Sequence, residues 1–287
     1  MGTKTGLVTL PLGLAASLIW CAASSAAVYG GQTVAHDPIA ITLAKNGQVK
    51  SIALDWTAPC TSGKSYTFGG VLTATKKMPS VVGTADNPLI GKMKKGRLSG
   101  TGLGSAALGD GVGGAISHKF AGKFKPGSAS GTWSGHMDVV DAGGSKIDSC
   151  DTGTLRWAAM RGPNVYGGST TQGEPVVVIT KTDRSGVGYF GFGWRADCTP
   201  AGSDQWHISE EFGNFPMTGS GAFGDTFTNE FPYKDATGKN TFTYALDGTL
   251  GKTSGAGSVS VHVVEADAAG SPTSTCDTNS VKWSVRQ

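Results

Sequence analysis

The chain carries the same ordered set of uncommon residues twice. The first set opens with VYGGQT at Val28 and the second with VYGGST at Val165. In each set a Pro and an apolar run follow, then Trp-x-x-x-Cys, and finally Cys-Asp-Thr with a Trp six residues beyond the Asp. A repeat of this length indicates a tandem domain duplication rather than a solenoid. We therefore predict homologous domains over 28–160 and 164–287.

The pattern within each copy favours β-structure. In the stretch that ends at Trp56, Ile52 and Leu54 share one face with it, and the opposite face, with Ala53 and Asp55, is expected to lie largely toward water. The chain has 45 Gly with aromatic residues spread throughout, which indicates short strands and tight turns. We predict an all-β fold of two tandem antiparallel β-sandwiches, jelly-roll-like or immunoglobulin-like.

The first 27 residues resemble a secretory signal. Lys4 precedes an apolar stretch over 7–21, and small residues lead to a cleavage position after Ala27. A lipid anchor on Cys21 is the alternative, but Trp20 is too large for the residue before a lipidated Cys. Export places the protein outside the cell or at its surface. No later segment is long enough to span a membrane.

Cleavage after Ala27 leaves four cysteines, an even number that favours disulfides in an exported chain. A bond repeated in both copies must lie within each copy, which predicts Cys60–Cys150 and Cys198–Cys276. Pairing across the copies is the alternative and requires a swapped arrangement. The joint over 158–164 is very short, so we expect the domains to touch.

The motif at Cys150, CDTG, invites comparison with the catalytic Asp-Thr-Gly of two-lobed aspartic proteases. Asp151 and its counterpart Asp277 instead follow a Cys near the end of each copy, and the second motif has Asn where the Gly belongs. We expect the Asp and Thr side chains to bond nearby backbone and shape the turn into the last strand.

Other motifs predict neither a cofactor nor a metal site. GSGAFG at 219–224 matches a dinucleotide-binding glycine pattern but continues as strand and turn. None of the five His forms a pair at metal-ligand spacing, and no Cys is spare once two disulfides form. A dispersed Ser-His-Asp arrangement stays open, although no nucleophile elbow is present.

Residues without a match in the other copy are where a function would appear. Trp133 aligns with a Gly, and Trp206 has at best Tyr66 or Phe68 as its counterpart. Exposed aromatic rings stack on sugars, so these two Trp residues are candidates for carbohydrate binding. The alternative is a differently filled core.

The charge is divided between the copies. Residues 28–163 contain 15 Lys and Arg against 8 Asp, whereas residues 164–287 contain 8 against 13 acidic residues. Lys94, Lys95 and Arg97 lie in a segment that lengthens the first copy, and they are candidates for binding an anionic polymer. Docking of one domain on the other and head-to-tail self-association are alternatives. Nucleic acid is a weaker partner because no aromatic residues interleave these cations.

The order YGG-x-T, Trp-x-x-x-Cys and Cys-Asp-Thr-Gly-x-x-Arg-Trp resembles duplicated, disulfide-bonded domains of exported bacterial proteins, of the actinobacterial type. The resemblance covers nearly all of the mature chain. It implies export and duplication, and it carries over no catalytic residue.

We therefore expect a secreted, non-catalytic binding or surface protein that recognises carbohydrate or an anionic polymer. An extracellular hydrolase is the first alternative, with its carboxylates in the second copy and His207 assisting. Its candidate acids are Asp204, Glu210, Glu211 and Glu230. Self-assembly through opposite charges is the second alternative.

Overall fold

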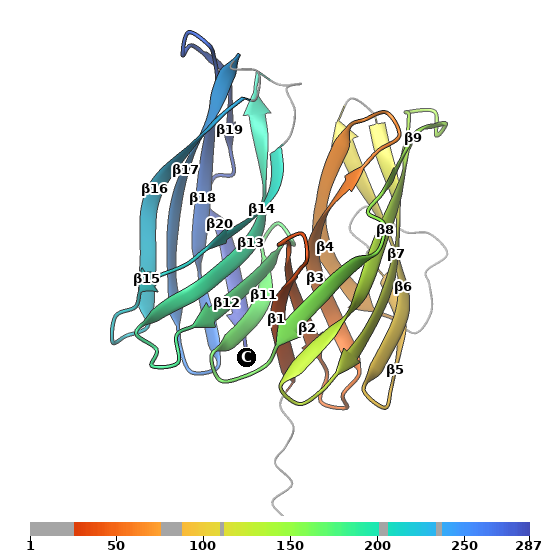
Figure 1. The fold of residues 1–287 in the computed structure, drawn as a ribbon, viewed down its shortest axis with the longest axis vertical. Helices are drawn as coiled ribbons and strands as arrows, with labels where there is room; N and C mark the ends of the chain where they lie inside the picture. Colours follow the sequence, from red (N-terminus) through yellow and green to blue (C-terminus); the bar gives the residue numbers. More distant parts are fainter. Residues whose placement is uncertain (1–25, 76–87, 110–111, 201–205, 234–236) are drawn as a thin grey trace, which may run out of the picture.

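The computed structural model describes residues 26–287 apart from 76–87, 110–111, 201–205 and 234–236. Every regular element in that part of the chain is a β-strand, which confirms the predicted all-β class (Figure 1). Among these residues there is no helix of the length and apolarity needed to cross a bilayer. Residues 1–25 of the predicted signal segment lie outside the described part of the structure. Ala27, the last residue of that predicted segment, is the first residue of the first strand.

The first ten strands form one hydrogen-bonded sheet, here called the N-terminal sheet. They are β1 (Ala27–Thr33), β2 (Pro38–Leu43), β3 (Val49–Pro59), β4 (Ser65–Ala74), β5 (Pro88–Lys94), β6 (Arg97–Gly109), β7 (Val112–Phe124), β8 (Ser128–Val140), β9 (Lys146–Asp151) and β10 (Leu155–Met160). Strands β1 to β9 lie side by side in chain order, and β10 pairs with both β1 and β8. All these pairs are antiparallel except β4–β5, a parallel contact of two residue pairs.

The remaining strands form a second sheet, here called the C-terminal sheet. They are β11 (Val165–Thr170), β12 (Pro175–Thr180), β13 (Gly186–Thr199), β14 (Trp206–Phe212), β15 (Phe215–Pro216), β16 (Ala222–Pro232), β17 (Gly238–Leu250), β18 (Ser254–Asp267), β19 (Pro272–Asp277) and β20 (Val281–Arg286). Its main path runs β14-β13-β12-β11-β20-β18-β17-β16. No strand joins β14 to β16 within the described residues, whereas β5 bridges the equivalent position in the N-terminal sheet.

The predicted two-sheet sandwich is not confirmed, because each half forms one continuous sheet. In the C-terminal half β20 lies between β11 and β18, and β19 pairs with both β18 and β13. Because β12 also pairs with β11 and β13, six strands close into a barrel: β11, β12, β13, β19, β18 and β20. An alternating pattern shows which face of a strand is buried but not which strand edges meet, so it does not distinguish a closed barrel from two stacked sheets.

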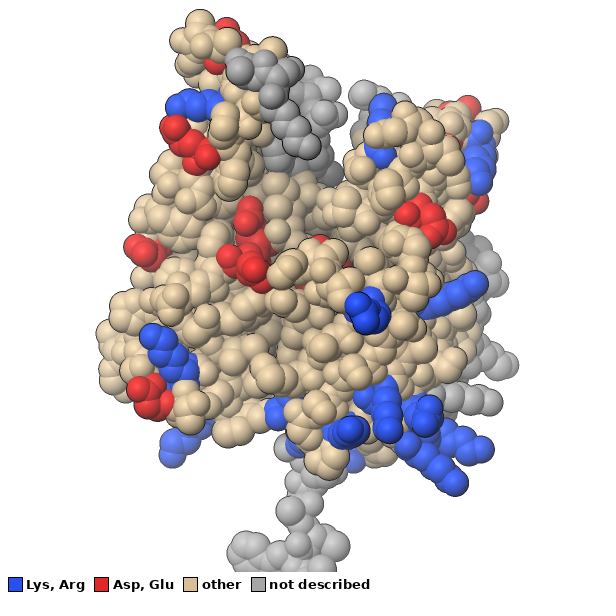
Figure 2. Space-filling model, in the orientation of Figure 1, with Lys and Arg blue, Asp and Glu red and all other residues tan. Residues whose placement is uncertain are grey.

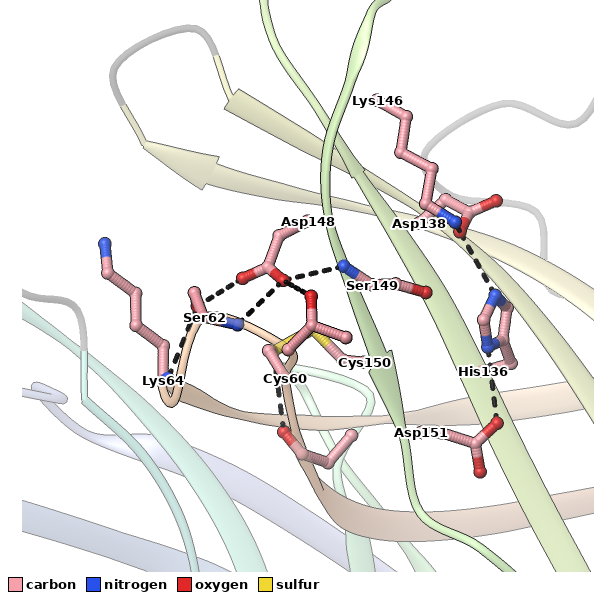
Figure 3. The surroundings of a disulfide bond; sticks show 12 residues. Cys60, Ser62, Lys64, His136, Asp138, Lys146, Asp148, Ser149, Cys150 and Asp151 are labelled. Carbon is pink, nitrogen blue, oxygen red and sulfur yellow. Dashed lines mark hydrogen bonds and ion pairs between the residues drawn. A yellow bond between two sulfur atoms is a disulfide. The ribbon is translucent and has the colours of Figure 1, made fainter.

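Both predicted disulfides are present, at Cys60–Cys150 and Cys198–Cys276. The first bond joins the residue after β3 to β9, and the second joins β13 to β19. Figure 3 shows the first bond with its polar surroundings. The cross-copy pairing is thereby excluded.

The turn role predicted for the Cys-Asp-Thr motif is confirmed. The Asp151 Oδ1 atom accepts a hydrogen bond from the backbone N–H of Gly153 at 2.6 Å, and Thr152 Oγ1 accepts one from that of Gly135 at 2.9 Å. Asp151 also contacts His136, which belongs to the neighbouring strand (Figure 3). Asp277 makes the equivalent contact with a His of its own sheet. In the second copy the backbone contact comes from Thr278, whose Oγ1 accepts a hydrogen bond from the N–H of Val261 at 2.9 Å.

Each sheet wraps its own apolar core. The four Trp residues that match between the copies are buried, as the repeat predicts: Trp56, Trp157, Trp194 and Trp283. Alternate residues of β7 and β8 point into the first core and the intervening ones outward, which is the period-two pattern of a strand with one buried face.

Candidate functional site

The outer face of β3 meets the other sheet instead of water. Ala53 is 5% exposed and Asp55 is fully buried, which corrects the expectation that this face is solvated. Ala53 and Ala40 pack against Val177 of β12 in a small apolar cluster separate from both cores. A sequence pattern for one strand cannot show that a second sheet covers its polar face.

The contact between the sheets is reciprocal. A Cβ atom added to Gly30 would lie 2.9 Å from Val177 Cγ1, and one added to Gly167 would lie 2.8 Å from Val28 Cγ1 and 3.0 Å from the Cβ of Ala40. Strands β1 and β2 thus meet β11 and β12 through corresponding residues. The touching domains predicted from the short joint are confirmed.

At one end of this junction three titratable side chains converge. Asp55 comes from the centre of β3, Glu174 from the residue before β12, and His207 from β14. The His207 Nε2 atom lies 3.1 Å from Glu174 Oε2 and 3.9 Å from Asp55 Oδ1. Both carboxylates are fully buried, and the His side chain is 10% exposed. The cluster therefore joins residues of both sheets, with its two carboxylates out of contact with solvent and its His at the edge of the buried region.

Two glycines make room for these carboxylates. A Cβ at Gly69, the β4 partner of Asp55, would lie 1.7 Å from Glu174 Oε2 and 1.8 Å from Asp55 Oδ1. A Cβ at Gly193 of β13 would lie 1.7 Å from Asp55 Oδ2. Any side chain at either position would displace an acid, so these glycines are needed for close approach rather than for backbone flexibility.

One oxygen of each carboxylate lies beside a polar partner. Ser209 Oγ donates to Asp55 Oδ2 at 2.9 Å, and Arg195 Nε forms an ion pair with Glu174 Oε1 at 2.8 Å. Arg195 is itself held by Gln172, whose backbone carbonyl and side-chain oxygen accept its hydrogen bonds. The other two oxygens, Asp55 Oδ1 and Glu174 Oε2, face His207.

The pKa values of the two acids are shifted in opposite directions. Burial and the adjacent Glu174 raise the pKa of Asp55 well above its usual range. Burial alone would also raise the pKa of Glu174, but His207 and Arg195 beside it bring that pKa below its ordinary value. A buried acid pair with divided pKa values can share a proton, or it can hold a cation.

A cleft of about 1100 Å³ reaches this cluster. Its walls come from β4 on the N-terminal sheet and from β13 and β14 on the C-terminal sheet. The lining includes Gly69, Arg195 and His207, together with Trp56 and His118 from the first core. No hydrogen-bond partner is present for the buried His118 Nδ1 among the described residues, and burial lowers the pKa of His118 to about 4.

A second feature lies on the outer surface of the N-terminal sheet, where an open depression of about 700 Å³ borders the β5–β6 hairpin. Lys94, Lys95 and Arg97 line it together with Lys123 of β7. Figure 2 shows basic side chains gathered over this edge of the sheet, the position of β5 and β6 in Figure 1. Lys95 and Gly96 both have positive φ, as a two-residue type I′ hairpin requires.

The structure corrects one of the predicted carbohydrate-binding residues. Trp133 is 1% exposed, and its ring packs against Trp56 and His118 inside the N-terminal sheet. It therefore fills the core, which was the alternative, and cannot stack on an external sugar. Trp206 begins β14, and its side chain lies outside the described part of the structure.

The candidate acids of the hydrolase hypothesis lie in separate settings. Glu210 accepts a hydrogen bond from Tyr244, Glu211 faces His36 across the junction, and Glu230 pairs with a Lys on the neighbouring strand. Asp204 lies outside the described residues. Among the described residues of that hypothesis, only His207 lies in the junction cluster.

The sequence pattern does not identify Asp55 and Glu174 as site residues, and the reason is physical. The period-two pattern assigned Asp55 to water because it assumed that one face of β3 was free. One signal was available: an acid stands directly before the Pro that opens the second strand of each copy, at Asp37 and Glu174. Such a match indicates a position that the fold uses, but it does not show that Asp55 and His207 lie beside it.

The fold and these features define a class, an all-β protein of two disulfide-bonded sheets joined through a buried polar cluster. Comparisons with protein-family models, with curated proteins and with solved structures show no match. The function therefore has to be argued from the residues themselves.

Proposed function

We propose that the chain is an exported, non-catalytic protein that binds an acidic polysaccharide at the depression beside the β5–β6 hairpin. One observation carries the proposal: Lys94, Lys95, Arg97 and Lys123 are exposed around one depression. Within the described residues, none of the four has an acidic partner at ion-pair distance. Unneutralised cations on one surface attract an extended anion.

The arrangement suits a linear polyanion. Arg97 and Lys123 are register partners on β6 and β7. Lys119 lies four residues before Lys123 on the same face of β7, about 13 Å away along the strand. Ser99, Ser130 and Thr132 place hydroxyl groups in the depression, and hydroxyl groups suit hydrogen bonding to sugar and carboxylate oxygens.

The lining favours a polysaccharide over a single-stranded nucleic acid. No aromatic side chain is among the residues that form the depression, so bases would have no ring to stack on. Trp133 lies on the adjacent strand β8 but points into the core.

Tandem duplication of one exported unit is part of the proposal. The two copies share their disulfide position and their strand register: Tyr29 pairs with Ile41 in the first sheet, and Tyr166 pairs with Val178 in the second. Strand β5 and the cationic hairpin have no counterpart in the described part of the second sheet, which supports a function acquired by the first copy.

The test is titration calorimetry with polygalacturonate as the acidic probe and dextran as the neutral control. We expect wild type to bind only the acidic polymer, and a triple variant Lys94→Gln, Arg97→Gln, Lys123→Gln to bind roughly 10-fold more weakly or worse. Affinity should also fall as salt rises.

A matched control removes three exposed charges from the C-terminal half by Lys181→Gln, Lys252→Gln and Lys282→Gln. This control should bind as wild type does. Equal loss in both triple variants, or no binding of wild type to polygalacturonate, would exclude the proposed site.

The other two hypotheses have less support. Self-assembly through opposite charges competes with contacts inside the molecule, since Ser209 and Glu211 of the acidic segment already face the N-terminal sheet. A mass that light scattering finds unchanged between low and high salt would rule it out. The hydrolase hypothesis requires two accessible acids at one site, and its described candidates have separate partners.

A further inference from the structure

We propose that Asp55, Glu174 and His207 form a binding site for one divalent transition-metal ion of the Zn²⁺ class, which links the two sheets. One ligand would come from the N-terminal sheet and two from the C-terminal half. The site is independent of the cationic depression on the outer surface.

The distances between the three donor atoms fit a common centre. Asp55 Oδ1 and Glu174 Oε2 lie 1.8 and 1.7 Å from one point, the Cβ position of Gly69, so they are at most 3.5 Å apart. The His207 Nε2 atom lies 3.1 Å from the Glu174 oxygen and 3.9 Å from the Asp55 oxygen. Tetrahedral Zn²⁺ with bonds of about 2.1 Å places its ligands about 3.4 Å apart.

One of the three converging donor atoms, Asp55 Oδ1, is also without a hydrogen-bond partner among the described residues. Asp55 is fully buried, and among the described residues no hydrogen-bond donor reaches its Oδ1 atom. A buried carboxylate oxygen without a donor costs free energy, and a coordinated cation removes that cost. This unsatisfied atom points toward the other two donors, which is why the cluster is more than a group of neighbouring acids.

The surrounding residues have the roles expected of a second coordination shell. Ser209 holds one oxygen of Asp55, and Arg195 holds one oxygen of Glu174, so each acid presents its remaining oxygen to the centre. Such partners orient metal ligands and tune their affinity. Gly69 and Gly193 leave the space that this orientation needs.

The ligand chemistry selects the class of ion. One imidazole nitrogen with two carboxylate oxygens suits Zn²⁺, Co²⁺ or Mn²⁺ better than Mg²⁺ or Ca²⁺, which prefer oxygen donors alone. The cleft lined by Gly69 and His207 provides a route for the ion and for a water molecule as a further ligand. Local His spacing could not predict this site, because its ligands come from three separate segments.

The test begins with the untagged full chain, stripped with a chelator and dialysed. We expect it to bind one equivalent of Zn²⁺ by calorimetry and by elemental analysis, to show a visible absorption band with Co²⁺, and to gain thermal stability with Zn²⁺ but not with Mg²⁺. Absence of stoichiometric Zn²⁺ binding by the folded wild-type chain overturns the proposal.

Variants then locate the ion. Asp55→Asn and Glu174→Gln keep the side-chain shapes and should weaken Zn²⁺ binding about 100-fold or more, whereas Ser209→Ala should weaken it about 10- to 100-fold. Glu230→Gln, at an exposed acid paired with Lys239, is the matched control and should bind as wild type does. Wild-type affinity in a folded Asp55→Asn variant would also refute the site. If Asp55→Asn fails to fold, the Ser209→Ala variant and the wild-type measurement decide.

Discussion

Replacing Gly30 by Ala tests the reciprocal contact between the sheets. The new methyl carbon would lie 2.9 Å from Val177 Cγ1 and 3.1 Å from Val165 Cγ1, whereas apolar carbons pack best at about 3.5–4.0 Å. The sheets must therefore separate locally by roughly 0.6 Å or more. Overpacking of this kind costs about 1–3 kcal/mol.

The unfolded chain partly offsets that cost. Gly→Ala reduces the conformational entropy of the unfolded state and adds about 0.4–1 kcal/mol of stability where the site has room. We therefore expect a net loss of up to about 2.5 kcal/mol in the free energy of unfolding. Gly167→Ala should cost a similar amount, because its methyl carbon would meet Val28 Cγ1 at 2.8 Å.

Urea denaturation followed by tryptophan fluorescence measures these changes, with Gly127→Ala as the matched control. Gly127 has nothing within 4 Å of its added Cβ, so its variant should be neutral or slightly stabilised. The double variant Gly30→Ala, Gly167→Ala should lose less than the sum of the single losses, because one separation of the sheets relieves both contacts. If Gly30→Ala were as stable as Gly127→Ala, the sheets would not meet as described.

Three further predictions concern the cores and the junction. Removing either disulfide, by Cys60→Ala with Cys150→Ala or by Cys198→Ala with Cys276→Ala, should lower the free energy of unfolding by about 4.5 kcal/mol in denaturation experiments. The reason is that the bonds close loops of 90 and 78 residues. Clearly unequal losses would contradict this loop-closure explanation. Trp133→Ala should lose about 3–5 kcal/mol in the free energy of unfolding, because Trp133 fills the core. A folded Trp133→Phe variant should bind polygalacturonate as wild type does. If it folded normally but lost binding, Trp133 would have to be part of the ligand site. Burial raises the pKa of Asp37 to about 6, above its unfolded value of 3.8. The stability that comes from protonated Asp37 is therefore fully present below pH 4 and is lost as the pH rises through 6. Relative to wild type, Asp37→Asn should gain up to about 3 kcal/mol in the free energy of unfolding at pH 7.5 and nothing at pH 3.5, as measured by matched denaturation curves.

The sequence by itself determined the features that are set by short-range pattern and by repetition. The all-β class followed from turn residues and alternating strands, and the pairing Cys60–Cys150 and Cys198–Cys276 followed from the requirement that a repeated bond lie within each copy. The turn role of Asp151 was predicted from the local Cys-Asp-Thr-Gly pattern. These inferences needed no knowledge of how distant strands meet.

Only the tertiary structure decided what covers each strand and which side chains meet across the junction. Asp55 has the sequence pattern of a solvated residue, yet it is buried because the C-terminal sheet packs against β3. Its approach to Glu174 and His207 depends on the angle and separation of two sheets, quantities that arise from the summed packing of many residues. Strand closure into a barrel has the same origin, since hydrogen bonding between strand edges depends on position in space and leaves no local mark on the chain.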